Sequence, residues 1–205
     1  MSGLLNLSSL IDAFTTRIGK WMSWLILVAV IVSAGNATIR YLVSSSSNAW
    51  LELQWYLFSA TFLLVAPWTL QQQEHIRIDI VNARLSKRVR DWIELLGHIF
   101  FLMIVCGVMF YYGAIFAQKS FQSGEISPNA GGLIVWPAKI LTPIGFALLL
   151  LQGVSEIIKR IAIMRGLMED NLGGGHHAAA EAEALRLLEA AKAEAALAGE
   201  PSAKP

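Results

Sequence analysis

The chain of 205 residues has a single cysteine, Cys106, and few charged residues. One cysteine forms neither an intramolecular disulfide nor a thiolate metal cluster, so we expect Cys106, which lies in an apolar run, to be a small packing residue. Charged residues make up 15% of the chain and hydrophobic residues 55%, whereas soluble domains are about 25% charged. The composition therefore argues against a water-soluble globule.

The sequence also lacks an excess of positive or negative charge and the common cofactor-binding motifs. The formal net charge is +1, without the basic footprint of a nucleic-acid-binding protein, and no G-x-x-x-x-G-K-[ST] phosphate loop occurs. His98 is the only histidine in an apolar run, whereas haem ligation between helices usually needs two facing histidines. The sequence thus predicts no catalytic residue, no cofactor, no metal site and no nucleic-acid partner.

Long hydrophobic runs are what the sequence does contain. A helix rises about 1.5 Å per residue, so about 20 apolar residues cross a hydrocarbon core of about 30 Å. Four runs qualify, over about residues 21–39, 51–70, 92–116 and 133–158. They lack the alternation of barrel strands. We therefore predict an all-α integral membrane protein, whose four transmembrane helices form one domain over residues 1–165.

Basic residues gather on one side of these runs. They are Arg17, Lys20, Arg77, Arg84, Lys87, Arg88, Arg90, Lys159, Arg160 and Arg165. The positive-inside rule then places both termini in the cytoplasm. An alternative for the first run is a cleaved signal peptide, because small residues follow it near 34–37. Its length and the three later runs favour an uncleaved anchor.

The loop between the second and third runs interleaves apolar and basic residues. We expect an amphipathic segment along the inner headgroups that buries Ile76 and Ile80 and directs Arg84 to anionic lipid, with an ordinary basic loop as the alternative. His75 and Asp79 would share a face there if the segment is helical. Membrane lipid is therefore an expected partner of this chain.

The C-terminal residues change in composition after three consecutive glycines. Alanine and glutamate dominate from there on, so residues 166–205 are expected to form a glycine linker and a polar, partly helical cytoplasmic tail. Docking of a partner on this tail is the alternative to a solvated tail, because it carries a weak apolar stripe.

Ionisable residues are missing from the middles of all four runs. Those within the runs lie near the ends, and transport through these helices alone would need charge or broken helices at mid-membrane. Arg40 and Glu52 flank the first outer loop, where an ion pair would tie the first two helices at the membrane surface. Gly113 with Ala117, and the series at 29, 33 and 37, have the spacing that permits close helix approach.

Several short motifs occur in a characteristic order. They are Asn36 and Arg40 at the end of the first run, Trp50-Leu51-Glu52, Glu74-His75-Ile76-Arg77-Ile78-Asp79, Glu125-Ile126-Ser127-Pro128-Asn129-Ala130-Gly131-Gly132-Leu133, Trp136-Pro137-Ala138-Lys139 and Leu151-Gln152-Gly153. In this order they resemble the small, DctQ-like membrane subunit of the tripartite ATP-independent periplasmic (TRAP) transporters. The likeness covers about residues 9–165 and is nearest to the branch often labelled for mannitol or chloroaromatic compounds.

This resemblance implies two partners and a function. One partner is a large, elevator-type membrane subunit that carries the substrate and sodium sites and forms a one-to-one heteromeric complex with this chain. The other is a periplasmic substrate-binding protein. The small subunit would brace the static scaffold in the bacterial inner membrane while organic acids are imported. Arg40, Glu52, His75, Arg77 and Asp79 would be structural or interface residues. The resemblance implies no enzyme activity.

Two other functions remain open from the residues alone. The first is a membrane anchor of a redox enzyme that holds haem or quinone between four helices, which an absorption spectrum would test. The second is a small exporter working as a homodimer, which the missing central carboxylate disfavours.

Overall fold

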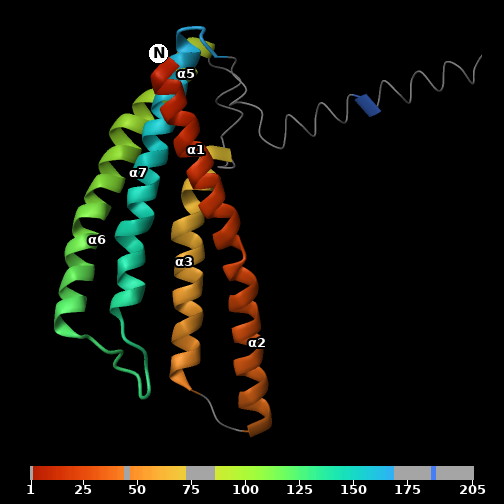
Figure 1. Ribbon diagram of the computed structural model, residues 1–205, viewed down its shortest axis with the longest axis vertical. Helices are drawn as coiled ribbons and strands as arrows, with labels where there is room; N and C mark the ends of the chain where they lie inside the picture. Colours follow the sequence, from red (N-terminus) through yellow and green to blue (C-terminus); the bar gives the residue numbers. More distant parts are fainter. Residues whose placement is uncertain (1, 44–46, 73–85, 169–185, 188–205) are drawn as a thin grey trace, which may run out of the picture.

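The computed structural model describes residues 2–43, 47–72, 86–168 and 186–187. Their elements are the helices α1 (Ser2–Ser23), α2 (Leu25–Val43), α3 (Asn48–Gln72), α5 (Lys87–Leu96), α6 (Met103–Ser123) and α7 (Trp136–Met164), with a π-helix, η1 (Gly97–Leu102), between α5 and α6. Figure 1 shows them as elongated rods lying along one direction. Within these residues, strand-like pairing consists of one isolated bridge between Ile126 and Ile134.

The prediction of four transmembrane helices is confirmed. Four helical stretches are long and apolar enough to cross a membrane: Ser2–Val43, Asn48–Gln72, Lys87–Ser123 and Trp136–Met164. The first three extend beyond the predicted run at both ends, because the hydrophobic pattern marks only the apolar part of a helix, whereas the fourth begins three residues later than predicted and ends six residues later. The cytoplasmic location of both termini stays a prediction. The expected amphipathic segment and C-terminal tail lie almost entirely outside the described residues.

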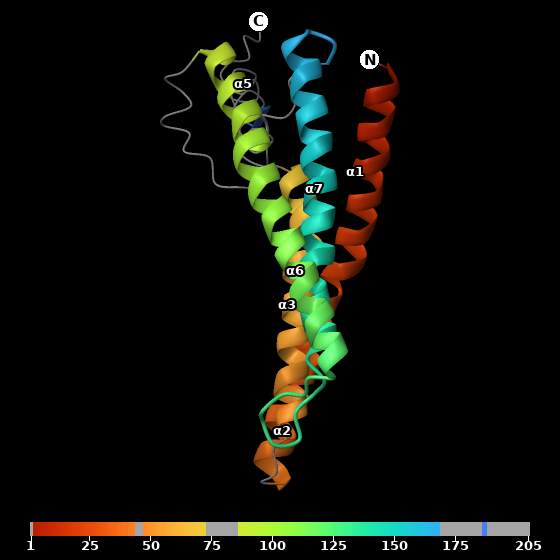
Figure 2. The same ribbon diagram turned by 90° about the vertical axis from the view of Figure 1, so that its left-hand side faces the viewer.

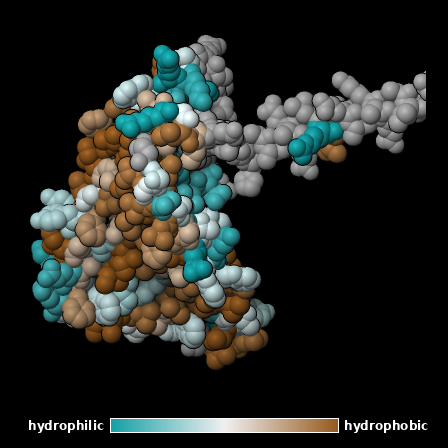
Figure 3. Space-filling view, turned by 45° about the horizontal axis from the view of Figure 1, so that its top comes forward, coloured by the Kyte–Doolittle hydropathy of each residue, from teal (hydrophilic) through white to brown (hydrophobic). Residues whose placement is uncertain are grey.

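Large apolar side chains cover much of the outer surface. Phe62 and Phe101 are each 77% exposed, and Tyr41 and Trp21 are 87% and 71% exposed. The space-filling view shows brown, hydrophobic residues over large parts of the visible helical face, between paler and teal patches (Figure 3). A soluble protein rarely exposes so large an apolar surface, so this surface fits contact with lipid or with another membrane protein.

Helices α1 and α2 form the longest helical stretch, and the hydrophobic pattern predicts only its second half, α2. The hydrophobic run indicated a helix from about residue 21, whereas helical structure begins at Ser2 and continues to Val43 with one turn residue, Trp24. In Figure 1 the two helices follow one another along one side of the molecule. Polar residues lower the hydropathy of α1. Those such as Ser8 and Thr15 are buried against neighbouring helices, so α1 packs into the bundle although it is less apolar.

Helix α7 is the centre of the bundle. It contacts α6, α3 and α1, the last through residues 152–159, and it contacts α5 near its C-terminal end through Arg160. Figures 1 and 2 show α7 beside α6 on one side and beside α1 on another. Helix α7 has more buried residues than any other described helix, and Gln152 and Ser155 are among them. The bundle is therefore organised around one helix.

Small residues set the close approaches to α7. A Cβ at Gly145 would lie 2.8 Å from Leu63 Cβ and 2.9 Å from the Leu63 carbonyl oxygen of α3. A Cβ at Gly113 would lie 3.2 Å from Thr142 Cγ2. With Ala117 also buried, the predicted small-residue seam on α6 is confirmed.

The corresponding seam on the first helix is wrong for this fold. Ala29 is completely buried, but Ser33 and Ala37 are exposed and line an open hollow. Asn36 is the buried residue on that part of α2 instead. The residues at 29, 33 and 37 therefore do not form one continuous packing face.

Replacing Gly145 by alanine should loosen the α3–α7 contact, because the added methyl group meets backbone atoms that cannot rotate away. We expect a loss of about 1 to 3 kcal/mol, read as a lower unfolding temperature of the purified chain in detergent. Gly107→Ala is the matched control, since nothing lies within 4 Å of a Cβ there. Equal melting temperatures for the two variants would contradict the packing described.

Candidate functional site

The polar side of α1 faces the inside of the bundle. Ser8 and Thr15 are each 2% exposed, whereas Leu10 and Phe14 on the same helix are 67% and 51% exposed. This is the reverse of a helix on a soluble protein, and it fits surroundings in which lipid is the outer solvent. The buried polar groups must then find partners on neighbouring helices.

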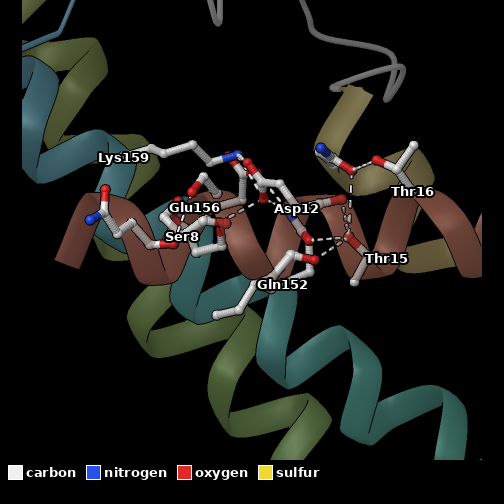
Figure 4. A network of polar contacts seen from close by, with 12 residues as sticks. Ser8, Asp12, Thr15, Thr16, Gln152, Glu156 and Lys159 are labelled. Carbon is white, nitrogen blue, oxygen red and sulfur yellow. Dashed lines mark hydrogen bonds and ion pairs between the residues drawn. The ribbon is translucent and has the colours of Figure 1, made fainter. Parts of the chain in front are cut away.

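Asp12 lies at the centre of these contacts (Figure 4). Its carboxylate accepts hydrogen bonds from Ser155 Oγ at 2.7 Å and from Gln152 Nε2 at 2.9 Å. Lys159 Nζ lies 3.1 Å from Asp12 Oδ2, and the same ammonium group pairs with Glu156. One lysine therefore neutralises part of the charge of two carboxylates on two helices.

The side chain of Gln152 is completely buried and uses both ends of its amide. Its Nε2 donates to Asp12 and to Glu156 Oε1, each at 2.9 Å, and its Oε1 accepts from Thr15 Oγ1 at 2.8 Å. An amide in this position cannot be replaced by an apolar residue without leaving several groups unpaired. Gln152 thus connects the Thr15 hydroxyl group to the carboxylates of Asp12 and Glu156.

Further hydroxyl groups extend the network to α3. Ser8 Oγ and Ser155 Oγ lie 2.7 Å apart, and Thr16 Oγ1 donates to Gln71 Oε1 at 2.8 Å. We call the whole set the polar seam: Ser8, Asp12, Thr15, Thr16, Gln71, Gln152, Ser155, Glu156 and Lys159. The seam joins α1, α3 and α7.

A second buried ion cluster joins α7 to α5. Arg160 Nη1 lies 3.1 Å from Asp91 Oδ1, and its Nη2 pairs with Glu94. Asp91 and Arg160 are both 5% exposed. Lys159 and Arg160 are neighbours in sequence, so they leave α7 in different directions and fasten it to two different helices.

The chemistry available to these clusters is structural. The two carboxylates of the seam, the Gln152 amide and the Lys159 ammonium group are bound to one another. Among the described residues, no group of three or more histidine, cysteine, aspartate or glutamate side chains is placed to hold a metal ion. Removing one partner of such a buried pair costs stability, so these pairs hold neighbouring helices together.

At the opposite end of the bundle, Glu52 fixes the loop between α6 and α7. Its carboxylate accepts hydrogen bonds from Ser127 Oγ, from Asn129 Nδ2 at 2.8 Å and from the Leu133 backbone N–H at 2.6 Å. A Cβ at Gly132 would lie 2.9 Å from Glu52 Oε1, so glycine is required for this approach. We call these contacts the outer clamp.

Two further contacts from α3 support the outer clamp. Asn48 Nδ2 donates to the Ala130 carbonyl oxygen and Tyr56 Oη to that of Ile134, both at 2.9 Å. The loop is therefore fastened to α3 at several points along its length, in addition to its covalent ends on α6 and α7.

Glu125, in the same loop, binds the two helices that the loop connects. Its carboxylate binds Lys139 Nζ and, at 2.8 Å, Ser120 Oγ. These two hydrogen bonds, with that from Lys139 the stronger influence, hold the pKa of Glu125 below its usual value. The carboxyl group therefore stays ionised at neutral pH, and protonation at low pH would weaken the pair. Lys139 also lies over the Phe116 ring, 4.0 Å from its centroid.

The structure tests part of the predicted site. The expected ion pair between Arg40 and Glu52 is wrong: among the described residues Glu52 binds the 127–133 loop, and Arg40 lies with Ser33 and Gln54 beside a hollow of about 500 Å³. The two residues are close in sequence, but their side chains leave different helices in different directions. His75, Arg77 and Asp79 lie outside the described residues.

The polar seam is the feature that reasoning from sequence missed. The signal was present as the spacing of Ser8, Asp12 and Thr15, which places three polar groups on one face of a helix. On α7, Gln152, Ser155 and Lys159 have the complementary spacing. Such stripes are found by asking for polar periodicity inside apolar segments, rather than for isolated charge.

Lys159→Met should destabilise the bundle, because it leaves Asp12 and Glu156 without their shared countercharge. Removal of one partner of a buried pair costs about 3 to 5 kcal/mol. Adding Glu156→Gln to this variant should recover part of the loss by removing one of the two carboxylates. Thermal unfolding in detergent measures both effects, with the exposed Lys119→Met as control. A double variant no more stable than the single one would contradict the shared-charge arrangement.

Glu52→Gln should release the α6–α7 loop, since an amide cannot accept the same set of hydrogen bonds from Ser127, Asn129 and Leu133. Hydrogen exchange at the Leu133 amide is expected to rise on the order of tenfold. Glu125→Gln removes the other carboxylate of this loop without touching that amide. The clamp is disproved if both variants change the Leu133 exchange rate equally.

Comparison with known proteins identifies the family. The chain matches the family model of the tripartite ATP-independent periplasmic transporters, DctQ component, over residues 29–162, which include α3, α5 and α6 and most of α2 and α7. No curated protein and no solved structure matches it. The matched region covers both the outer clamp and the α7 side of the polar seam. The chain is a multi-pass membrane protein that belongs to the DctQ family of TRAP transporter components.

Proposed function

We propose that this chain is the small permease subunit of a sodium-coupled TRAP transporter that imports organic acids. It would act without catalysis, as a static scaffold for a larger, elevator-type membrane subunit in a one-to-one complex. The observation that carries this proposal is the polar seam, in which polar side chains of α1, α3 and α7 bind one another across the contacts between these helices. Helices joined by such contacts form a rigid bundle, which suits a static support for a moving partner better than a carrier that changes conformation.

The distribution of charge supports a scaffold over an autonomous carrier. The buried ion pairs of the described residues lie near the end of the bundle formed by α1, α5 and the C-terminal part of α7, and buried Glu52 at the opposite end is bound by the α6–α7 loop. A carrier needs polar groups or broken helices that are available to a solute at mid-membrane. Exposed aromatic residues of η1 and α6, such as Phe101 and Tyr112, instead offer apolar area to a membrane partner.

Sidedness follows from the basic residues. The end of the bundle that holds Lys159 and Arg160 would face the cytoplasm, and the outer clamp would face the periplasm. A loop fastened by Glu52 presents a fixed surface, which suits docking of a periplasmic binding protein better than a loop without such contacts.

Reconstitution tests this function. The genes expected beside this one encode a larger membrane protein and a secreted binding protein, and tagged chain extracted in mild detergent should bring down the larger protein. Liposomes containing both membrane proteins should accumulate organic acid under an inward sodium gradient when the binding protein is added. Liposomes with either membrane protein alone should not.

Two results would overturn the proposal. One is uphill uptake by liposomes that contain this chain alone, which would make it a carrier. The other is full uptake by the larger protein without this chain, which would leave the scaffold without a function. A Soret absorption band in the purified chain would point instead to a redox anchor.

A further inference from the structure

A hollow of about 530 Å³ opens between α1 and the C-terminal end of α3. It is lined by Asp12, Ala13, Thr16, Arg17, Lys20, Trp21 and Gln71. We call it the basic hollow. It lies on the outside of the polar seam, beside the contact of Thr16 with Gln71, so the seam fixes the backbone on which its side chains are carried.

The basic hollow carries an excess of positive charge. Arg17 and Lys20 are three residues apart on α1, so they lie on one face, and both are exposed. Neither has an ion-pair partner anywhere in the described part of the chain. The one acidic lining residue, Asp12, is already bound by Lys159 and Ser155. Two cations are therefore available to an anion.

Neutral groups at the same place add donors. Gln71 accepts hydrogen bonds from Thr16 and Thr15 through Oε1, and no described residue accepts a bond from its Nε2. The Trp21 ring, 71% exposed, lies at the rim, where an amphipathic aromatic group is favoured at a membrane surface. The basic hollow is thus surrounded by two cations, the amide donor of Gln71 and the aromatic ring of Trp21.

Apolar surface continues from the basic hollow along the same rod. Beyond Trp21 the chain enters α2, where Ile26, Val30 and Ile31 are 51%, 54% and 62% exposed. A ligand with an anionic head and long apolar tails would place the head at Arg17 and Lys20 and the tails along α2. A free anion would use only the first part of this surface.

We propose that the basic hollow binds the phosphodiester headgroup of an anionic glycerophospholipid. Arg17 and Lys20 pair with the phosphate, Gln71 Nε2 donates to one of its oxygens, and the acyl chains lie against the exposed face of α2. By the distribution of basic residues this lipid belongs to the cytoplasmic leaflet. The binding needs only this chain and none of the other transporter components.

The test uses the purified full-length chain in a mild detergent, with lipid binding measured by native mass spectrometry. Phosphatidylglycerol, phosphatidylcholine and inorganic phosphate are titrated separately. We expect retention of phosphatidylglycerol over phosphatidylcholine, and a loss of affinity of about tenfold in the double variant Arg17→Gln/Lys20→Gln. Arg88→Gln/Lys119→Gln removes two other exposed cations outside the hollow and should leave the affinity unchanged.

Three outcomes would overturn the lipid site. Equal affinity for phosphatidylglycerol and phosphatidylcholine would show that the cations do not recognise headgroup charge. Equal losses in the two double variants would assign the effect to overall charge. Competition by inorganic phosphate at the concentration of the lipid would show an anion site without a lipid. Retention of affinity in Arg17→Lys, together with its loss in Arg17→Gln/Lys20→Gln, would support charge recognition without dependence on guanidinium geometry.

Discussion

The constraint on which this structure depends is that buried polar groups must find partners away from water. Ser8, Asp12 and Thr15 lie on one face of α1, and each finds its partner on α7. Turning α1 about its axis would leave an aspartate and two hydroxyl groups facing hydrocarbon, at a cost far above that of misplacing a leucine. The polar seam therefore fixes the rotation of α1, and with it the outward direction of Leu10 and Phe14.

Once α1 is fixed, α7 becomes the helix to which the others are attached. Lys159 binds α1 and Arg160 binds α5, while Gly145 and Gly113 permit close approach of α3 and α6. At the far end Glu52 ties α3 to the loop that leads into α7. The bundle is thus fastened at both ends by polar contacts and along its middle by small residues. Such an arrangement suits a rigid component of a larger transporter.

The hydrophobic pattern was sufficient to predict the four helices, because the cost of an unpaired backbone in lipid leaves few other structures. It did not predict α1, since Asp12 and its neighbouring hydroxyl residues lower the hydropathy of a helix whose polar face turns inward. Glu52 was identified as a structural residue from its motif, but its partner was wrong. Sequence proximity suggested Arg40, whereas the loop at 127–133 is close only in the folded chain. Gln152 belonged to a motif used for the resemblance, and its role emerged only from its contacts.

Cysteine cross-linking in isolated membranes tests the polar seam most directly. With Cys106 replaced by alanine, cysteines at 8 and 155 should join readily under a mild oxidant, because the two native Oγ atoms lie 2.7 Å apart. Ser9 is exposed and points elsewhere on α1, so a cysteine there should not join one at 155. Mass spectrometry of the linked peptides reads both results. Failure of the Ser8–Ser155 pair, or equal cross-linking from Ser9, would contradict the packing of α1 on which this account depends.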